Sequence, residues 1–413
     1  MVWPGWWSLA GTEIVNNNRA AAYAGTAGLV LECDTCPALP MALGHRAYVS
    51  PGVDPAPWWD DANARVAARV FGFVGLDLQG FGKAPTTRQV TQLVTGGGQL
   101  GPRSRTDREV TPKILLLAAD EEAASYGLAW LASALRGSLC PDCDGDEMCV
   151  FTACPSRTSG GDREARSLLG VGLMEGPSVT AVHHFTSGVG WELDATLAAG
   201  APWIYHPPAA TVTTAGATAG FVQVPAFDQQ PQCQDTTWTI SDPDCPVPPL
   251  PPQPPALRDP CWPVDGYRAK RWMFDIGMDA LPQWLEIVPM VELHTGARDM
   301  RRLTIRFHAN PTGRPCTGAL DPCQACMDIS LAYLPRGVGL RVDGRVQRAV
   351  VDQVAGRYTA SATPVLYGRG GGLYTWPILE CTAGLCVEIL AEARYVADDA
   401  WASVSLVARE DAA

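Results

Sequence analysis

The alternation of apolar and polar residues predicts a chain built mainly from β-strands. Residues 191–197 alternate strictly between the two kinds of side chain, which is the pattern of a strand with one buried face. Residues 303–309 and 387–393 repeat this alternation in the last third of the chain. The apolar-rich segments 69–81 and 113–119 indicate two further strands.

One segment between these strands, residues 120–136, follows helical spacing instead. Asp120 is a favourable N-cap, and Gly137 is a typical residue for ending a helix. The apolar positions between them recur every three or four residues, at Ala124, Leu128, Leu131 and Leu135. The sequence therefore predicts one packed helix here and a shorter second helix over residues 16–23.

A proline-rich segment divides the chain into two parts. Seven of the ten residues at 246–255 are proline, which favours an extended polyproline II conformation. We therefore predict a first domain over residues 1–240, a linker over 241–263 and a second domain over 264–413.

The second domain is predicted to be an antiparallel β-sandwich or jelly roll. Its strands follow one another without a helical segment, and Asp343-Gly344 is a typical hairpin turn. The predicted fold class is therefore mainly β, with an α+β first domain in which one helix packs on a β-sheet.

Composition and net charge make some classes of binding partner unfavourable. The 413 residues are 47% hydrophobic and 18% charged, which is typical of a globular protein. A net charge of −12 argues against binding to nucleic acid or to an anionic membrane surface. The longest aliphatic run, at 114–119, is too short to insert across a membrane, and the first residues lack the pattern of a secretory signal.

The fourteen cysteines are more than a cytosolic protein usually contains. Four lie together in CPDCDGDEMCVFTACP: Cys140, Cys143, Cys149 and Cys154. Disulfides are the favoured interpretation, with a four-thiolate zinc site and unpaired thiols as open alternatives. A calcium loop is disfavoured because Gly145 comes too early for that turn. Elsewhere, structural roles are expected for Cys33, Cys36, Cys381 and Cys386.

No catalytic motif is found in the sequence. The nucleophile elbow, the two-histidine zinc helix and the phosphate-binding loop are all missing. The adjacent pair His183-His184 does not favour chelation, because neighbouring side chains on a strand point to opposite faces. The sequence therefore predicts no enzyme, no cofactor and no metal, although a carboxylate pair that meets only in the folded protein escapes such a search.

Several segments resemble minor tail proteins of long-tailed (siphovirus) actinobacteriophages. They include the opening WWSLAGTEIVNNNRAAAYA, APWWDD at 56–61, and ILLLAADEEAASYGLAWLASALRG around the predicted helix. LLGVGLMEGPSVT at 168–180 and ELDATLAAGAPWIY at 192–205 are similar to the closing strands of the ring-forming domain in distal tail proteins. LRVDGRVQRAVV and LYGRGGGLYTWPILEC, at 366–381, are similar to the β-sandwich of the same phage proteins.

The resemblance implies a structural virion protein of the tail tip, synthesised in the host cytoplasm. The first domain would form an oligomeric ring, commonly a homohexamer, that joins the tail tube to the tip or baseplate hub. The implied partners are copies of itself, the tail tube protein, the tail tip hub and other minor tail proteins. The second domain would be a galectin-like or carbohydrate-binding-like sandwich. Disulfides in such a protein could close late, after lysis.

Two surfaces are candidates for binding. The tryptophan-rich start, with Trp3, Trp6 and Trp7, is expected to carry the ring interface, because a monomer rarely keeps such aromatic area in water. The alternative function is a host-glycan-binding tail module acting through the second domain. Its aromatic side chains could stack on sugar rings, and they are Tyr367, Tyr374, Trp376 and Trp401.

Overall fold

The computed structural model divides the chain into two compact units. The first comprises Met1–Pro207 together with Arg409–Ala413, and the second comprises Pro208–Ala408. The structure describes residues 4–31, 36–45, 47–94, 96–138, 145–155, 164–208, 210–215, 221–223, 268–277, 284–310, 315–316, 320, 325–353, 359–368, 374, 376 and 384–411. Both units are built mainly from antiparallel strands, so the predicted mainly β fold class is confirmed.

This division differs from the boundary expected at residues 241–263. β11 (Ala210–Ala215) and β12 (Phe221–Gln223) precede that segment, yet they pair with β21 and β13 of the second unit. The proline-rich segment itself lies outside the described residues. Short edge strands of this kind have too few residues to show a periodic pattern, whereas a run of prolines is conspicuous in any sequence.

The first unit contains a twisted sheet with branches at one long strand. β8 pairs over its first residues with β7 and β10, and over most of its length with β9. The order is β10-β8-β7-β1-β2 on one branch and β8-β9-β6-β3 on the other. The strands are β1 (Trp6–Leu9), β2 (Thr12–Asn16), β3 (Val70–Gln79), β6 (Arg108–Ala118), β7 (Asp146–Phe151), β8 (Ala165–Phe185), β9 (Gly188–Ala199) and β10 (Ile204–Tyr205).

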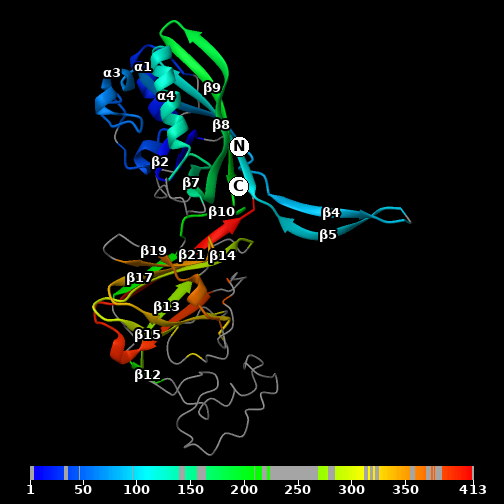
Figure 1. Cartoon of the computed structure of the whole chain (residues 1–413), viewed down its shortest axis with the longest axis vertical. Coiled ribbons are helices and arrows are strands. Elements are labelled where there is room, and N and C mark those ends of the chain that lie inside the picture. The colour runs from blue at the N-terminus through cyan, green and yellow to red at the C-terminus, as the bar shows by residue number, and fades with distance from the viewer. Residues whose placement is uncertain are drawn as a thin grey trace, which may run out of the picture. The chain divides into compact units, whose positions relative to one another are not determined.

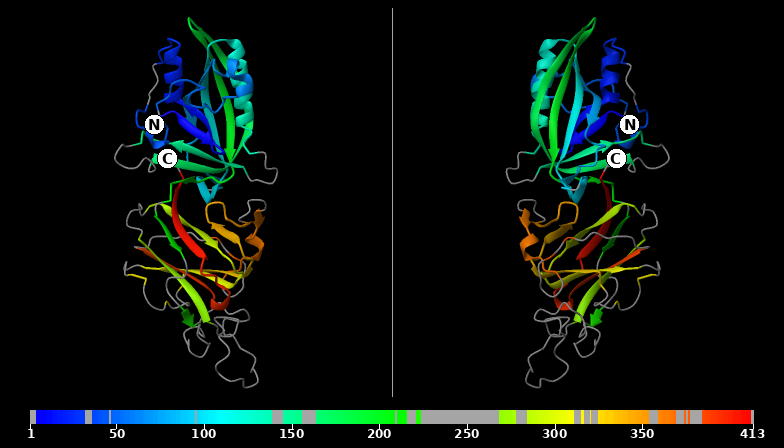
Figure 2. Two further views of the ribbon diagram at one scale, coloured as in Figure 1. Left: turned by 90° about the vertical axis from the view of Figure 1, so that its left-hand side faces the viewer. Right: turned by 90° about the vertical axis from the view of Figure 1, so that its right-hand side faces the viewer.

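Two helices cover one face of this sheet, as Figures 1 and 2 show. α1 (Asn17–Thr26) begins at Asn16, whose side chain accepts a hydrogen bond from the Arg19 amide. α4 (Glu121–Ala134) begins at Asp120, which caps the Ala123 amide at 3.0 Å. Both predicted helices are therefore confirmed. The short helices are η1 (Asp61–Asn63), α2 (Leu39–Ala42) and α3 (Ala64–Ala67).

Close packing of α4 on the sheet depends on a glycine in the helix. A Cβ atom at Gly127 would lie 2.8 Å from a methyl carbon of Leu116 in β6, which is closer than real Cβ contacts allow. The helix therefore lies directly on the strand, and Leu116 and Leu131 are fully buried in the same core. Propensity alone disfavours glycine inside a helix, so this position is set by packing.

The second unit is a sandwich of two antiparallel sheets. Its strands are β11, β12, β13 (Arg268–Gly277), β14 (Glu286–His294), β15 (Met300–Ala309), β16 (Met327–Leu334), β17 (Val338–Asp343), β18 (Arg348–Gln353), β19 (Thr359–Ser361), β20 (Gly384–Glu392) and β21 (Trp401–Glu410), with short helices η7 (Thr363–Val365) and η9 (Ala393–Tyr395). One sheet has the order β19-β18-β17-β14-β21, with β11 on β21, and the other has the order β12-β13-β20-β15-β16.

One hydrophobic core joins the two sheets of the second unit. Leu293 and Leu340 from the first sheet lie in the same buried cluster as Trp272, Ile305 and Val387 from the second. The alternation that predicted strands at 303–309 and 387–393 therefore does point one set of side chains inward. The hairpin expected at Asp343-Gly344 is present, with a four-residue loop between Asp343 and its pairing partner Arg348.

Candidate interaction surface

The tryptophan-rich start does not form the exposed surface that the sequence suggested. Trp7 is fully buried, and Trp6 is only 8% exposed. β1 and β2 form a tight hairpin against β7, and Trp6 meets Phe151 of β7 edge to face at 5.2 Å. Trp3 lies outside the described residues. The aromatic area is therefore removed from water inside the first unit, and the expected ring interface is wrong at Trp6 and Trp7.

A chain of polar contacts supports this buried hairpin from the side of α1. Glu13 accepts hydrogen bonds from the Trp6 indole at 3.1 Å and from Arg19 Nε at 2.8 Å. Arg19 in turn donates to the Tyr23 hydroxyl, which donates to Asp54 Oδ2 at 2.7 Å. Burial is the main cause that raises the pKa of Tyr23, so the phenol remains a donor.

The surface that stands out is a second hairpin, formed by β4 (Thr86–Gln92) and β5 (Gly98–Arg105). These two strands pair only with each other among the described residues, and they extend away from the rest of the first unit in Figure 1. Within 86–105, the described residues are exposed except for Thr86 and Gly101, which are half-buried. The hairpin therefore has no core of its own.

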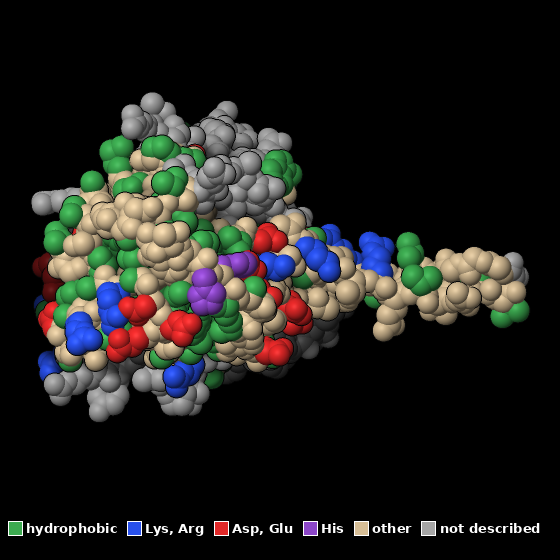
Figure 3. Space-filling model, turned by 90° about the horizontal axis from the view of Figure 1, so that it is seen from above, with side chains coloured by type: hydrophobic (Ala, Val, Ile, Leu, Met, Phe, Trp, Pro, Cys, Tyr) green, Lys and Arg blue, Asp and Glu red, His purple; other side chains and the backbone are tan. Residues whose placement is uncertain are grey.

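Apolar side chains lie on this exposed hairpin. Val90 and Leu100 are cross-strand partners, so they lie on the same face, and they are 58% and 62% exposed. Leu93 and Val94 add apolar area at the tip, where Val94 is fully exposed. Figure 3 shows hydrophobic side chains along the projecting hairpin and Lys or Arg side chains toward its base.

The hairpin is also basic, unlike the chain as a whole. No Asp or Glu occurs between Asp77 and Asp107, whereas the cationic residues of that stretch are Lys83, Arg88, Arg103 and Arg105. Arg103 and Arg105 both pair with the Asp411 carboxylate, the latter at 2.9 Å. The sequence reasoning missed this element because its strands lack an apolar alternation. The signal available was a Thr-rich run followed by Gly96-Gly97-Gly98.

A buried arginine holds the base of the hairpin. Arg108 is 1% exposed, and its burial lowers its pKa to about 10, although Asp411 and Glu410 oppose that change. Its guanidinium donates to five backbone carbonyls: those of Gly80, Phe81, Lys83, Pro202 and Asp411. The connections at the foot of the hairpin are thus tied to the body of the first unit.

Four of the cysteines that the structure describes form two disulfides between segments that are distant in the sequence. Cys36 is bonded to Cys154, 118 residues away. A bonded Cys154 cannot supply a thiolate, so the alternative zinc site on Cys140, Cys143, Cys149 and Cys154 loses one of its four ligands. Cys149 lies in β7, with its sulfur 3.6 Å from the Ser167 hydroxyl. Four of the cysteines considered above lie outside the described residues, namely Cys33, Cys140, Cys143 and Cys381.

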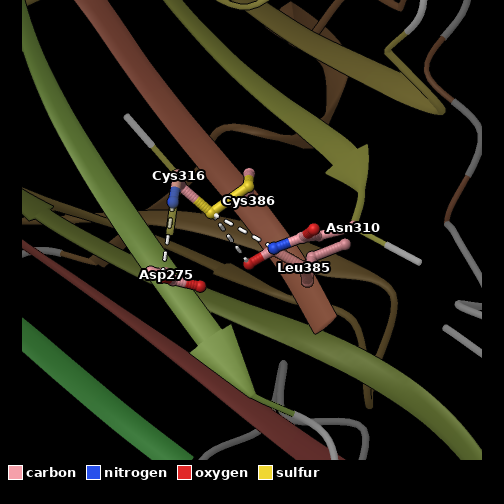
Figure 4. The surroundings of a disulfide bond; sticks show 5 residues. All are labelled: Asp275, Asn310, Cys316, Leu385 and Cys386. Atoms are coloured by element: carbon pink, nitrogen blue, oxygen red, sulfur yellow. Dashed lines mark hydrogen bonds between the residues drawn. A yellow bond between two sulfur atoms is a disulfide. The ribbon is translucent and has the colours of Figure 1, made fainter. Parts of the chain in front are cut away.

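The second disulfide joins Cys316 to Cys386 of β20 (Figure 4). The Cys316 amide donates to Asp275 Oδ2 of β13 at 3.3 Å, and Asn310 Nδ2 lies 3.9 Å from the Cys316 sulfur. Both cysteines are nearly buried. The bond therefore attaches a connecting segment to the sheet of the second unit, which is a structural role.

The four aromatic residues considered for sugar stacking have different surroundings. Tyr374 and Trp376 meet edge to face at 4.8 Å and pack against the core, and burial raises the pKa of Tyr374. Tyr367 is 44% exposed. Trp401 is partly exposed and stacks on His294. Tyr367 is thus the exposed member of this set, whereas Tyr374, Trp376 and Trp401 are all half-buried.

Neither a metal-binding cluster nor a membrane-spanning helix is found in the part of the chain that the structure describes. No group of three or more His, Cys, Asp and Glu side chains there could hold a metal ion. His183 instead contacts Glu192 across the β8–β9 pair at 2.7 Å. No described helix has the length and apolar character needed to cross a membrane.

Comparisons with known proteins give distant likenesses only. No protein-family model matches the chain, and no curated protein matches it. The crystal structure of the Dit protein (gp 19.1) of phage SPP1, described as a paradigm of hub adsorption apparatus in phages that infect Gram-positive bacteria, matches with 10% identity. That match covers 81% of this chain and 92% of the Dit chain at a TM-score of 0.35.

A second match is a chain from the baseplate of phage p2 in its activated conformation with Sr. It is 10% identical and covers 82% of this chain and 94% of that chain, with a TM-score of 0.29. Both TM-scores lie below 0.5, so neither likeness assigns a fold or a function to this chain.

Proposed function

We propose that this protein is a structural component of a phage tail tip that assembles with copies of itself into a ring. The sequence resemblance supplies the biological setting. The observation that carries the self-assembly is the β4–β5 hairpin, whose side chains are almost all exposed. The tail tube protein, the tip hub and other minor tail proteins are the further partners in this proposal. The proposed role is structural rather than enzymatic, and its proposed location is the virion tail tip.

An isolated two-stranded hairpin is at best marginally stable in water. Here the two strands run from residue 86 to residue 105 and present Val90, Leu100, Leu93 and Val94 to solvent. Exposed apolar area on an element without a core is typical of a surface that a partner covers. The clamp at Arg108 fixes the foot of the hairpin, so that the exposed part projects in a defined direction.

A second copy of the chain is the partner that the charge distribution favours. The charged side chains between Asp77 and Asp107 are all positive, while the whole chain has a net charge of −12. A basic hairpin is attracted to the acidic remainder of a neighbouring copy, and this attraction fixes orientation as well as speeding encounter. An interface that joins one surface patch to a different one also produces rings when its rotation closes.

Mass photometry of the full chain tests this proposal. The wild-type protein is expected to form a defined oligomer, and replacement of residues 87–104 by a short Gly-Ser turn is expected to leave a folded monomer. Thr86 and Arg105 are cross-strand partners, so a short turn can join them. A monomeric wild type at micromolar concentration, or an oligomer of unchanged size after the replacement, would overturn the proposal.

A matched pair of variants locates the contact on one face of the hairpin. Val90→Asp with Leu100→Asp places two charges on the apolar face, and Thr91→Asp with Gln99→Asp places the same two charges on the opposite face. We expect the first pair to dissociate the oligomer far more than the second. Equal effects would show that charge alone, and not the apolar face, governs assembly.

A further inference from the structure

We propose that the second unit binds a sugar ring in a shallow groove on the outer face of one of its sheets. The groove has a volume of about 210 Å³ and is formed by β14, β17, β18 and β21. The side chains that define it are Glu292, His294, Arg341, Asp352 and Trp401, around Gly339. This binding activity is separate from ring assembly and does not depend on it.

The groove exists because one side chain is missing from a row across the sheet. Gly339 of β17 is the pairing partner of His294 on β14 and of Asp352 on β18, so these three positions share a face. A Cβ atom at Gly339 would have its nearest neighbours 3.9 Å away, at two backbone oxygens. The glycine therefore leaves an open hollow between the histidine and the carboxylate.

One wall of the hollow is aromatic. The rings of His294 and Trp401 are nearly parallel, with an angle of 11° between their planes and 6.1 Å between their centres. The Gly296 amide donates to Nδ1 of His294 at 3.2 Å, so the neutral ring carries its proton on Nε2 and keeps one donor. Flat apolar faces of this kind suit the C–H face of a pyranose ring.

The remaining walls supply both acceptors and donors. Asp352 has no hydrogen bond or ion pair to its carboxylate from any residue that the structure describes. Arg341 Nε donates to Glu292 at 3.0 Å, and the two side chains are 51% and 38% exposed, which leaves their other polar atoms accessible.

The combination of hydrogen-bond donors and acceptors in the groove favours one class of ligand. A carboxylate only accepts hydrogen bonds and a guanidinium only donates them, whereas a hydroxyl group does both. A neutral sugar can therefore satisfy Asp352 and Arg341 at once. A lysine ammonium group only donates hydrogen bonds, so it could pair with Asp352 but would leave the accessible donors of Arg341 without an acceptor.

A glycan array probed with the labelled full-length protein tests the site. The array carries neutral pyranose oligosaccharides and, as a comparison, lysine-containing peptides. We expect the wild type to bind a subset of the sugars, Trp401→Ala to weaken that binding about tenfold, and Gly339→Val to abolish it by filling the hollow. Tyr333→Ala is the matched control, because Tyr333 is a half-exposed aromatic residue in the other sheet and should not affect binding.

The choice of variants allows a loss of binding to be distinguished from misfolding. Gly339 has a backbone conformation open to other residues, and valine suits a strand, so Gly339→Val is expected to melt like the wild type. Asp352→Asn preserves the shape of the side chain and is expected to weaken sugar binding. It takes the place of either other variant if that variant is unstable. No binding of the wild type to any sugar, preference for the peptides, or unchanged binding by folded Gly339→Val would each overturn the proposal. Mass photometry of the same samples reports assembly separately.

Discussion

The first unit contains two hairpins of opposite character. The β1–β2 hairpin is rich in tryptophan and is buried in the core, whereas the β4–β5 hairpin is rich in Thr, Gln and Arg and is exposed along its length. The sequence suggested an interface in the first of these and indicated nothing in the second. A cluster of aromatic residues in a sequence is therefore better evidence for a core position than for an interface, because burying apolar area inside the fold is favourable.

The exposed hairpin teaches the complementary point. An element becomes a candidate interface when it has regular secondary structure but none of the described residues of its own chain covers it. Its polar composition keeps the free chain soluble, and a few apolar residues such as Val90 and Leu100 suffice for a contact. The two hairpins should therefore respond oppositely to mutation: the first should govern stability, and the second should govern assembly.

The largest expected effect is the loss of the buried indole at Trp7. We expect Trp7→Ala to lower the free energy of unfolding of the first unit by about 3–5 kcal/mol, because it leaves a large cavity beside β7. Chemical denaturation followed by circular dichroism measures this change. The matched control is Trp284→Ala, since Trp284 is 73% exposed and its removal should cost less than about 0.5 kcal/mol.

If the two substitutions lowered the free energy of unfolding by similar amounts, Trp7 would not be a core residue, and the contrast between the two hairpins would fail. Deletion of residues 1–25 would therefore not be a clean test of assembly. It would remove β1, β2 and most of α1, so a loss of assembly after that deletion would report unfolding of the first unit.

A smaller effect is expected from the disulfide beside the buried hairpin. Cys36 lies in the same hydrophobic cluster as Trp6 and Phe151, and its bond to Cys154 closes a long loop. We expect Cys36→Ser to destabilise the first unit by about 2–4 kcal/mol. Hydrogen exchange should show faster opening of the amides of residues 6–16, with little change at 86–105.

Cys316→Ser is the matched control for this experiment, because its disulfide lies wholly in the second unit. It should speed exchange in β20 and leave residues 6–16 as they were. If the two substitutions had the same exchange pattern, the Cys36–Cys154 bond would have no particular connection with the buried hairpin.

The predictable parts of the fold were those with strong local signals. Asp120 before an apolar helical repeat located α4, and the alternation at 303–309 located β15. The pairing of Cys36 with Cys154 was not predictable, because any two of fourteen cysteines can meet once the chain folds. The β4–β5 hairpin could not be predicted from alternating apolar residues, because neither of its faces packs against a core in the described structure.

The groove in the second unit could not be predicted from the sequence. Trp401 was a candidate for sugar stacking from its type alone, but Tyr374 and Trp376 were equal candidates and pack against the core. What separates them is the register that places Gly339 between His294 and Asp352. That register depends on pairing between strands far apart in the chain, which local pattern does not specify.

The smallest expected effect concerns pH and again separates the two hairpins. Burial tends to raise the pKa of Asp54, but hydrogen bonds from Tyr23 and from the Ser50 and Val49 amides, with the charge of Arg19, bring it below its ordinary value. A carboxyl group with a lowered pKa in the folded protein stabilises that state above its unfolded pKa of about 4. This contribution is lost as pH falls through the lower folded value.

We therefore expect the stability of the first unit to fall as the pH drops below about 4, and Asp54→Asn to reduce the slope of that fall. Urea denaturation at fixed protein concentration measures both slopes. Asp398→Asn is the control, because its side chain is fully exposed in the second unit and should leave the slope unchanged. Equal slopes for wild type and Asp54→Asn would mean that the polar chain from Trp6 to Asp54 does not support the buried hairpin. In the exposed hairpin, Arg103 and Arg105 contact Asp411 and not Asp54, so Asp54→Asn should leave that hairpin unaffected.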